Sequence, residues 1–205
     1  MVKVGFLVEG DTEKVIVQSE AFQDLCKSLG IEVIRNVFPP HKKERGKDIF
    51  KNPEKIASFI NILSDMGASV IFCIRDLEDL PNISIAKAEI ASVDKRITKI
   101  IVVRKIESWF LADIVTIEKY FNNAVTSQFP EVQFPELLFR PDEKLKEVSV
   151  ATRNGKGIGD KLLFAKSLVR NGFSIQRAAA HPNCPSATYY LNKLSNINLQ
   201  QLLNK

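Results

Sequence analysis

Four short apolar segments, separated by helical patterns, limit most strongly what this chain can fold into. Residues 2–8 (VKVGFLV), 69–74 (SVIFCI) and 99–103 (KIIVV) are dense in β-branched residues, and residues 31–38 (IEVIRNVF) form a fourth predicted strand. Such runs are typical of strands that are covered on both faces. Strands that alternate with crossover helices indicate a mostly parallel sheet with right-handed connections. The sequence therefore predicts an α/β, Rossmann-like sheet of four strands flanked by helices.

The segments between these strands carry the apolar spacing and the end signals of helices. The predicted helices of this part of the chain are residues 13–29, 53–66 and 84–95. Asp11 or Thr12 can cap the first of them, and Gly30 directly after it is a natural C′ residue.

After about residue 115 the strand signal fades. A loop-rich stretch with several prolines is followed by three further helical patterns. We therefore expect an α/β core over residues 1–115 and a helical extension over residues 116–205, packed on the core. A chain of 205 residues, 45% hydrophobic and 26% charged, suits one domain with an elaboration.

The bulk composition predicts a soluble, cytoplasmic protein with no membrane partner. No basic segment followed by an apolar stretch opens the chain, and no apolar run approaches about 18 residues. The three cysteines lack zinc-finger or CxxC spacing, and Cys73 is expected to pack as a small buried hydrophobe. The net charge of +5 is a mild bias toward polyanionic partners.

Carboxylates follow three of the four predicted strands. Glu9 follows the first strand, Asp76 follows the third and Glu107 follows the fourth. A carboxylate at the end of a buried strand packs poorly, but it is well placed to hold a charged ligand. In parallel sheets, ligands bind just beyond the carboxyl ends of the strands. The sequence therefore predicts an acidic site at this edge of the sheet.

These acids suit a divalent cation. Mg²⁺ prefers oxygen ligands, and two-metal phosphodiester hydrolases hold ions about 3.5–4 Å apart with several carboxylates. Asp76 and Glu78 face the same way if their segment is extended, although a solvated turn is the alternative. Glu13 is equally explained as a first-turn acid that the helix dipole favours. The candidate metal ligands are Glu9, Glu13, Asp76, Glu78 and Glu107.

Three segments resemble a known family. "FLVEGDTEK" resembles the Toprim motif, in which a strand ends in Glu-Gly and the next helix carries another Glu. "VIFCIRDLED" resembles the second motif of that fold, a strand that ends in Asp-x-Asp. "VVRKIESWFLAD" is similar to a segment of small Toprim-like bacterial proteins of the DUF4276 type, which are related to the nuclease domain of the overcoming-lysogenisation-defect family. The later "GDKLLFA" and "CPSATYYLNKL" are similar to the Lys-bearing and Cys-Pro segments of that group.

The resemblance implies a Toprim-like core and a role for each acid. Glu9 would be the central metal ligand or the acid/base group, and Asp76 and Glu78 would bind the first ion. Glu13 and Glu107 would help to hold a second. The expected cofactor is Mg²⁺ or Mn²⁺, as one ion or two, and the implied activity is that of a nuclease in bacterial defence against phage.

The chain departs from the family pattern in its second motif. Glu78 stands where the family has a second Asp, and Asp79 lies beside it. The second ligand of this motif is therefore either Glu78 or Asp79.

Two basic segments could contact phosphate. "HKKERGK" at residues 41–47 could track a nucleic-acid backbone, with a solvated surface as the alternative. "RNGKGIGDK" at residues 153–161 does not match GxxxxGK[ST], so a Walker-type ATP site is not supported. Lys161 is either a cation that faces a scissile phosphate or an ordinary lysine at a helix start.

Trp109 is predicted to pack in the core, and Asp113 is either a polar contact at a helix end or a ligand.

Two functions fit the sequence. The first is a metal-dependent phosphodiesterase, a nuclease acting on nucleic acid, with Glu9, Asp76 and Lys161 as its catalytic residues. The second is a non-catalytic module that binds a metal or a nucleotide and acts with a partner ATPase, since the chain has no ATPase motif of its own. The sequence does not fix the oligomeric state and allows a homodimer.

Overall fold

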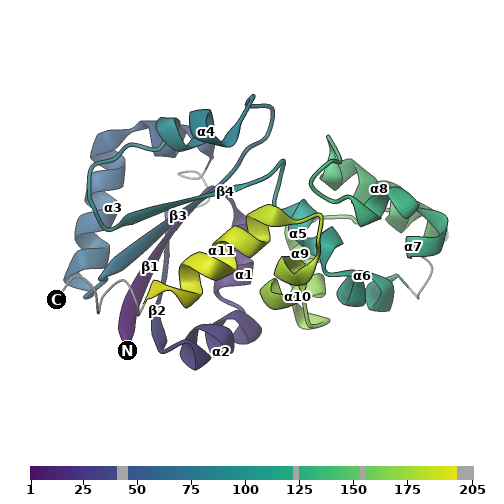
Figure 1. Ribbon diagram of the computed structural model, residues 1–205, viewed down its shortest axis with the longest axis horizontal. Helices are drawn as coiled ribbons and strands as arrows, with labels where there is room; N and C mark the ends of the chain where they lie inside the picture. Colours follow the sequence, from purple (N-terminus) through teal and green to yellow (C-terminus); the bar gives the residue numbers. More distant parts are fainter. Residues whose placement is uncertain (41–45, 122–124, 153–155, 198–205) are drawn as a thin grey trace. The chain divides into compact units, whose positions relative to one another are not determined.

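A computed structural model describes residues 1–40, 46–121, 125–152 and 156–197 of the chain (Figure 1). The chain divides into two compact units. Unit 1 comprises Met1–Ile101 together with Asn192–Lys205, and unit 2 comprises Val102–Leu191. The division at residue 115 that the sequence suggests stays a prediction.

The sheet of unit 1 confirms the predicted α/β class. Its strands are β1 (Val2–Val8), β2 (Ile31–Phe38), β3 (Val70–Asp76) and β4 (Ile97–Val102), whose last residue belongs to unit 2. They form one parallel sheet in the order β2-β1-β3-β4. Each of the four predicted strands is present within two residues of its expected start.

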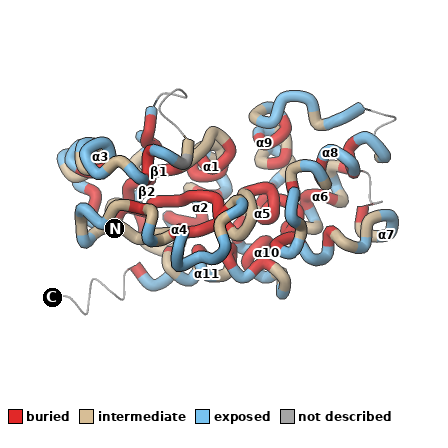
Figure 2. The backbone as a smooth tube through the Cα atoms, turned by 90° about the horizontal axis from the view of Figure 1, so that it is seen from above, coloured by how far each residue is buried: buried red, intermediate tan, exposed pale blue. Residues whose placement is uncertain are grey.

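Helices cover both faces of β1. Phe6 of β1 contacts Phe22 of α2 (Glu20–Ser28), with ring centroids 5.8 Å apart. Gly5 lies against Leu63 of α3 (Pro53–Asp65), where an added Cβ would come within 2.9 Å of the Leu63 methyl carbons. Neighbouring residues of a strand point to opposite faces, so α2 and α3 lie on opposite sides of the sheet. Most residues of β1 are therefore buried, which Figure 2 shows in red.

The prediction of one helix over residues 13–29 is wrong, because the chain forms two. The first is α1 (Asp11–Val17), and α2 begins at Glu20. Ser19 between them has extended backbone angles, and its Oγ accepts a hydrogen bond from the Phe22 N–H at 3.2 Å. Ser19 starts a new helix, because its hydroxyl accepts a hydrogen bond from a backbone N–H of the first turn. In a continuous helix, that N–H would donate to a backbone carbonyl instead.

The start of α1 also differs from the prediction. Gly10 occupies the N-cap position and has no side chain to accept a hydrogen bond, so neither Asp11 nor Thr12 caps this helix. The predicted end of α2 is confirmed. Gly30 has a φ of 73°, and its N–H donates to the Lys27 carbonyl at 3.0 Å. Glycine reaches this conformation without the steric cost of a Cβ.

The remaining elements of unit 1 are η2 (Lys47–Lys51) and α4 (Ile83–Glu89). The helix α4 ends earlier than the predicted residue 95. Lys99 of β4 reaches its last turn, where the Nζ donates to the Lys87 carbonyl at 2.9 Å. A lysine in this position satisfies carbonyl groups that have no partner within the helix.

Unit 2 is helical, as predicted for the C-terminal part of the chain. Its elements are α5 (Glu107–Ala112), α6 (Ile114–Tyr120), α7 (Val125–Gln128), η3 (Pro130–Gln133), α8 (Pro141–Thr152), α9 (Lys161–Arg170), α10 (Ile175–Ala180) and α11 (Pro185–Ser195), which continues into unit 1. The sequence did not predict α8, since its first residues lie in a stretch that reads as a loop. Among the described residues, no helix is both long and apolar enough to cross a membrane.

Two residues of unit 2 have the structural roles that their local sequence favours. Trp109 is buried, its Nε1–H donates to the Ser186 Oγ at 2.7 Å, and its ring stacks on Tyr190 at a centroid distance of 5.3 Å. Asp113 caps α6 and accepts a hydrogen bond from the Arg177 Nε at 2.7 Å. Trp109 is therefore a core residue, and Asp113 makes the expected polar contact at a helix end.

Candidate functional site

The strand order places a topological switch point between β1 and β3. The chain leaves β1 toward β2 on one side, and it returns to β3 on the other side of β1 (Figure 1). The connections leave opposite faces of the sheet here, which opens a crevice at the carboxyl ends of the two strands. Glu9 directly follows β1, and Asp76 is the last residue of β3. Two of the predicted site residues therefore lie where this fold class binds ligands.

Glu9 and Asp76 contact each other directly. The Asp76 N–H donates to the Glu9 Oε2 at 3.2 Å, and the Glu9 N–H donates to the Ile74 carbonyl at 3.1 Å. The backbone and the side chain of Glu9 are therefore both tied to β3. Asp76 is buried, and the Glu9 side chain is 12% exposed. Carboxylates that have lost most of their hydration are costly unless a cation or a set of donors is close.

A buried arginine that the sequence reasoning missed supplies one cation. The Arg75 Nε lies 3.9 Å from the Glu9 Oε2, and its second contact is from NH1 to the Glu89 Oε2 at 3.0 Å. Arg75 is 1% exposed, and its guanidinium lies 6.0 Å from the centroid of the Phe50 ring. Its one signal in the sequence is a basic residue that directly follows the apolar run of residues 69–74 and precedes Asp76. Glu89 carries no such signal.

The carboxylate of Glu13 lies close to the residue that follows Glu9. A Cβ added at Gly10 would come within 2.7 Å of the Glu13 Oε2, so this carboxylate occupies space that only a glycine leaves open. Glu13 is buried, unlike a solvated acid in a first helical turn. Glu13 therefore lies next to the end of β1, as a ligand would, and its role as a ligand stays a prediction.

The segment after Asp76 is not extended. Leu77–Leu80 form a turn in which the Leu80 N–H donates to the Leu77 carbonyl at 3.1 Å, and Glu78 has a φ of 49°. The extended conformation that would let Asp76 and Glu78 face the same way is therefore not formed, and the alternative of a turn is the one observed. A positive φ is costly for a residue other than glycine, and such strain is concentrated at functional sites. The choice between Glu78 and Asp79 stays open.

The two remaining site residues form an ion pair within unit 2. The Lys161 Nζ lies 2.7 Å from the Glu107 Oε1. Glu107 is buried, and its Oε2 has no hydrogen-bond partner among the described residues. Lys161 opens α9, directly after the N-cap Asp160. The structure thus joins the predicted cation to one predicted ligand, and each of these roles stays a prediction.

The chain matches no known family model, no curated protein and no solved structure. The resemblance to Toprim-like proteins therefore stays an inference from the motifs, and the site has to be judged by its own geometry.

The donor chemistry of the carboxyl edge fits a hard divalent cation. Glu9 and Asp76 offer oxygen ligands, and Mg²⁺ is commonly held by one or two carboxylates together with water and substrate phosphate. Within the described ranges, no three His, Cys, Asp or Glu side chains are arranged to hold an ion by themselves. The described residues therefore do not assemble the several converging carboxylates expected for a two-metal site, and a bound ion stays a prediction.

The basic segments lie partly outside the described residues. Of residues 41–47, only Gly46 and the backbone of Lys47 can be described, and the Gly46 N–H donates to the Glu9 carbonyl at 2.9 Å. The second segment is described from residue 156 onward. The predicted contacts of both segments with phosphate stay predictions.

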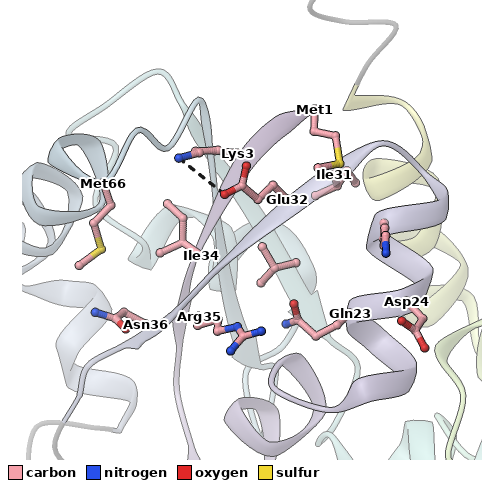
Figure 3. A pocket seen from close by; sticks show the side chains of 12 residues that line it. Met1, Lys3, Gln23, Asp24, Ile31, Glu32, Ile34, Arg35, Asn36 and Met66 are labelled. Atoms are coloured by element: carbon pink, nitrogen blue, oxygen red, sulfur yellow. Dashed lines mark ion pairs between the residues drawn. The ribbon is translucent and has the colours of Figure 1, made fainter.

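A separate pocket lies beside the edge strand β2 (Figure 3). It has a volume of about 600 Å³ and is lined by residues of β2, α2 and the start of β1, including Lys3 and Glu32, which form an ion pair at 3.6 Å. The pairing of β2 shifts here, since Val4 pairs with Val33 but Phe6 pairs with Val37. None of the predicted site residues lines this pocket.

The cysteines are poor candidates for a nucleophile. Cys26, Cys73 and Cys184 are all buried. Burial raises the pKa of the Cys26 and Cys73 thiols to about 12, and it raises the pKa of Cys184 as well. These thiols are protonated near neutral pH, and the thiolate is the reactive form. Cys73 has the core role that its sequence predicts.

Proposed function

We propose that this chain is a divalent-metal-dependent phosphodiesterase that acts on nucleic acid. The observation that carries the proposal is the contact of Glu9 with Asp76, 3.2 Å from carboxylate oxygen to backbone nitrogen, at the switch point of a parallel sheet. Asp76 is buried and the Glu9 side chain is only 12% exposed, so these carboxylates favour a cation, and the basic balance of the chain favours a polyanion as its partner.

The residues of unit 1 have different roles in this proposal. Glu9 and Asp76 would hold Mg²⁺ or Mn²⁺, with Glu13 and Glu78 as the further candidate ligands. The bound metal would supply an activated water and would neutralise charge on the phosphate. Arg75 would help to hold the Glu9 carboxylate in position, because it provides an opposite charge at 3.9 Å.

Lys161 and Glu107 form the second part of the proposal. A fixed cation stabilises the negative charge that develops on a phosphate during cleavage. Lys161 is suited to this task because its side chain is 56% exposed while its partner Glu107 is buried. A nuclease of this kind would fit the defence role that the resemblance implies.

Cleavage assays test the proposal. Plasmid and labelled single-stranded DNA and RNA would be incubated in EDTA, in Mg²⁺ and in Mn²⁺ with the wild type, Glu9→Gln and Asp76→Asn. We expect metal-dependent cleavage that falls at least about 100-fold in both variants, because each removes a direct metal ligand. Glu32→Gln is the matched control, since it changes an exposed acid of the same sheet and should leave the rate unchanged.

Other outcomes have clear meanings. Cleavage that survives both substitutions would refute the assignment of the site. The absence of cleavage under every metal, together with a thermal stability that Mg²⁺ does not change, would favour the alternative of a binding module that acts with a partner ATPase.

A further inference from the structure

One short segment of unit 2 exposes three large apolar side chains. In residues 134–140 (FPELLFR), Phe134 is 46% exposed, Leu137 is 76% exposed and Phe139 is 61% exposed. Single exposed apolar residues are common on protein surfaces, but a cluster of them is typical of a binding surface. We call residues 134–140 the aromatic segment.

Hydrogen bonds to residues 183–186 fix the position of the aromatic segment. Glu136 is buried, and its Oε1 accepts hydrogen bonds from the Ser186 N–H at 3.0 Å and from the Cys184 Sγ at 3.3 Å. The Asn183 side chain donates to the Gln133 carbonyl at 2.9 Å, directly before the segment. The apolar side chains around Glu136 are therefore displayed on an anchored backbone.

An arginine lies against the most accessible ring. The guanidinium carbon of Arg104 is 5.4 Å from the centroid of Phe139. Arg104 has a φ of 61°, a conformation that costs about 1–2 kcal/mol for a residue with a Cβ. Its Nε makes no hydrogen bond within the part of the chain that the structure describes. Arg104 thus adopts an unfavourable backbone conformation while its guanidinium contacts the ring.

This combination suits an unpaired nucleobase. Unpaired bases stack on aromatic rings and on the plane of an arginine, and here the Arg104 guanidinium lies over the ring of Phe139, a residue that remains 61% exposed. Arg104 lies two residues beyond β4 and three residues before Glu107, in the segment that leads from the sheet into α5. Arg104 is therefore close in sequence to Glu107, a residue of the proposed active site.

We propose that Phe139, Arg104 and Phe134 bind the unpaired bases of a single-stranded nucleic acid. The inference rests on the proposed function, since it assumes a nucleic-acid substrate, and it names the strand state of that substrate. Arg140 is partly exposed next to Phe139, but it already pairs with Asp142 at 3.7 Å and with Glu143 at 2.9 Å. Stacking rather than phosphate contact therefore carries the affinity, so binding depends only weakly on salt.

Binding without cleavage tests the inference. Fluorescence anisotropy would measure the Kd for a labelled 12-nucleotide DNA, for the same sequence as RNA and for its duplex, all in EDTA. Phe139→Tyr keeps the ring, whereas Phe139→Leu keeps an apolar side chain but removes the ring. We expect the tyrosine variant to bind single strands like the wild type and the leucine variant to bind about tenfold more weakly, as expected for the loss of one stacked base.

Leu137→Ala is the matched control. It removes the most exposed apolar side chain of the same segment, which has no ring, and it should leave the Kd unchanged. Equal binding by the Phe139→Leu and Phe139→Tyr variants, tighter binding of the duplex, or no binding of single strands would overturn the inference. Self-association in light scattering that Leu137→Ala and Phe139→Leu both abolish would assign the segment to a second copy of the chain instead.

The two proposals fail separately. If the wild type cleaves duplex DNA in the presence of metal but does not bind single strands, the proposed function is retained and the proposal of base stacking is refuted. If the protein binds single strands through the Phe139 ring but shows no metal-dependent cleavage, the proposal of base stacking is retained and the phosphodiesterase activity is refuted.

Discussion

At the scale of single residues, Arg75 controls the charge balance of the carboxyl edge. It is a fully buried cation shared by two carboxylates, Glu9 at 3.9 Å and Glu89 at 3.0 Å. Lys51 lies 3.4 Å from Glu89 on the outer side. A buried charge is tolerated only when it is paired, so these contacts depend on one another. The hydrogen bond from Arg75 is also the main reason why the pKa of Glu89 is lowered.

Removal of this cation should be costly. We expect Arg75→Met to reduce the free energy of unfolding by about 3 kcal/mol, because it removes a buried cation that is shared by Glu89 and by Glu9, whose side chain is only 12% exposed. Lys51→Met removes a cation from the same partner, Glu89, but its side chain is 47% exposed, so a loss of about 1 kcal/mol or less is expected. Urea denaturation of both variants checks the difference. Equal losses would mean that Arg75 has no special role.

The sequence indicates the acids of the site but not their cation. Glu9 and Asp76 are recognisable because each carboxylate stands at the end of an apolar strand. Arg75 occupies the position before Asp76, yet its partners come from the end of β1 and from α4. Those contacts depend on strand order and on helix placement, which no local pattern contains.

At the scale of elements, local signals predict strands and miss interruptions. The four strands are predictable because short runs rich in β-branched residues fit the pleated surface of a sheet. The break at Ser19 depends on a cap that competes with a continuous helix, and both choices satisfy the same apolar spacing. The turn at Glu78 requires a φ of 49°, which nothing in "RDLED" indicates. Alternation along an assumed strand could not have predicted it.

The turn that leads into β4 provides a pH-dependent test. The Asp94 Oδ2 accepts a hydrogen bond from the Arg96 guanidinium at 2.6 Å, and this contact is the main reason why the pKa of Asp94 is lowered to about 2. Because the folded pKa lies below the unfolded value of 3.8, the contribution to stability is present above pH 3.8 and is lost as the pH falls through about 2.

Asp94→Asn should therefore destabilise the protein in a pH-dependent way. We expect a loss of about 1 kcal/mol at pH 6, since the pair is partly exposed, and a smaller loss at pH 3. Urea unfolding of the variant and the wild type at several pH values checks this trend. A difference that stays constant over this range would show that the hydrogen-bond geometry, and not the charge, stabilises the turn.

At the scale of the whole molecule, the predicted ligands belong to two compact units. The carboxylates at β1, α1 and β3 lie in unit 1, whereas Glu107 lies in unit 2 with its partner Lys161. The rule that ligands bind at strand ends assigned all of them to one site from sequence alone. Whether any of them share an ion is a property of the assembled chain, and it can be measured directly.

Hydrogen exchange with and without metal makes that measurement. A ligand present at 100 times its Kd stabilises the state that binds it by about 2.7 kcal/mol, so amides that open only after the ion leaves should exchange about 100-fold more slowly. We expect this protection in β1, α1 and β3 of the wild type, none of it in Asp76→Asn, and all of it in Glu32→Gln. Metal-induced protection of α5 that disappears in Asp76→Asn would assign Glu107 to the same ion. Protection of β1 and β3 without any change in α5 would remove Glu107 from the ligand set, and the absence of protection in β1 would refute a metal site at Glu9.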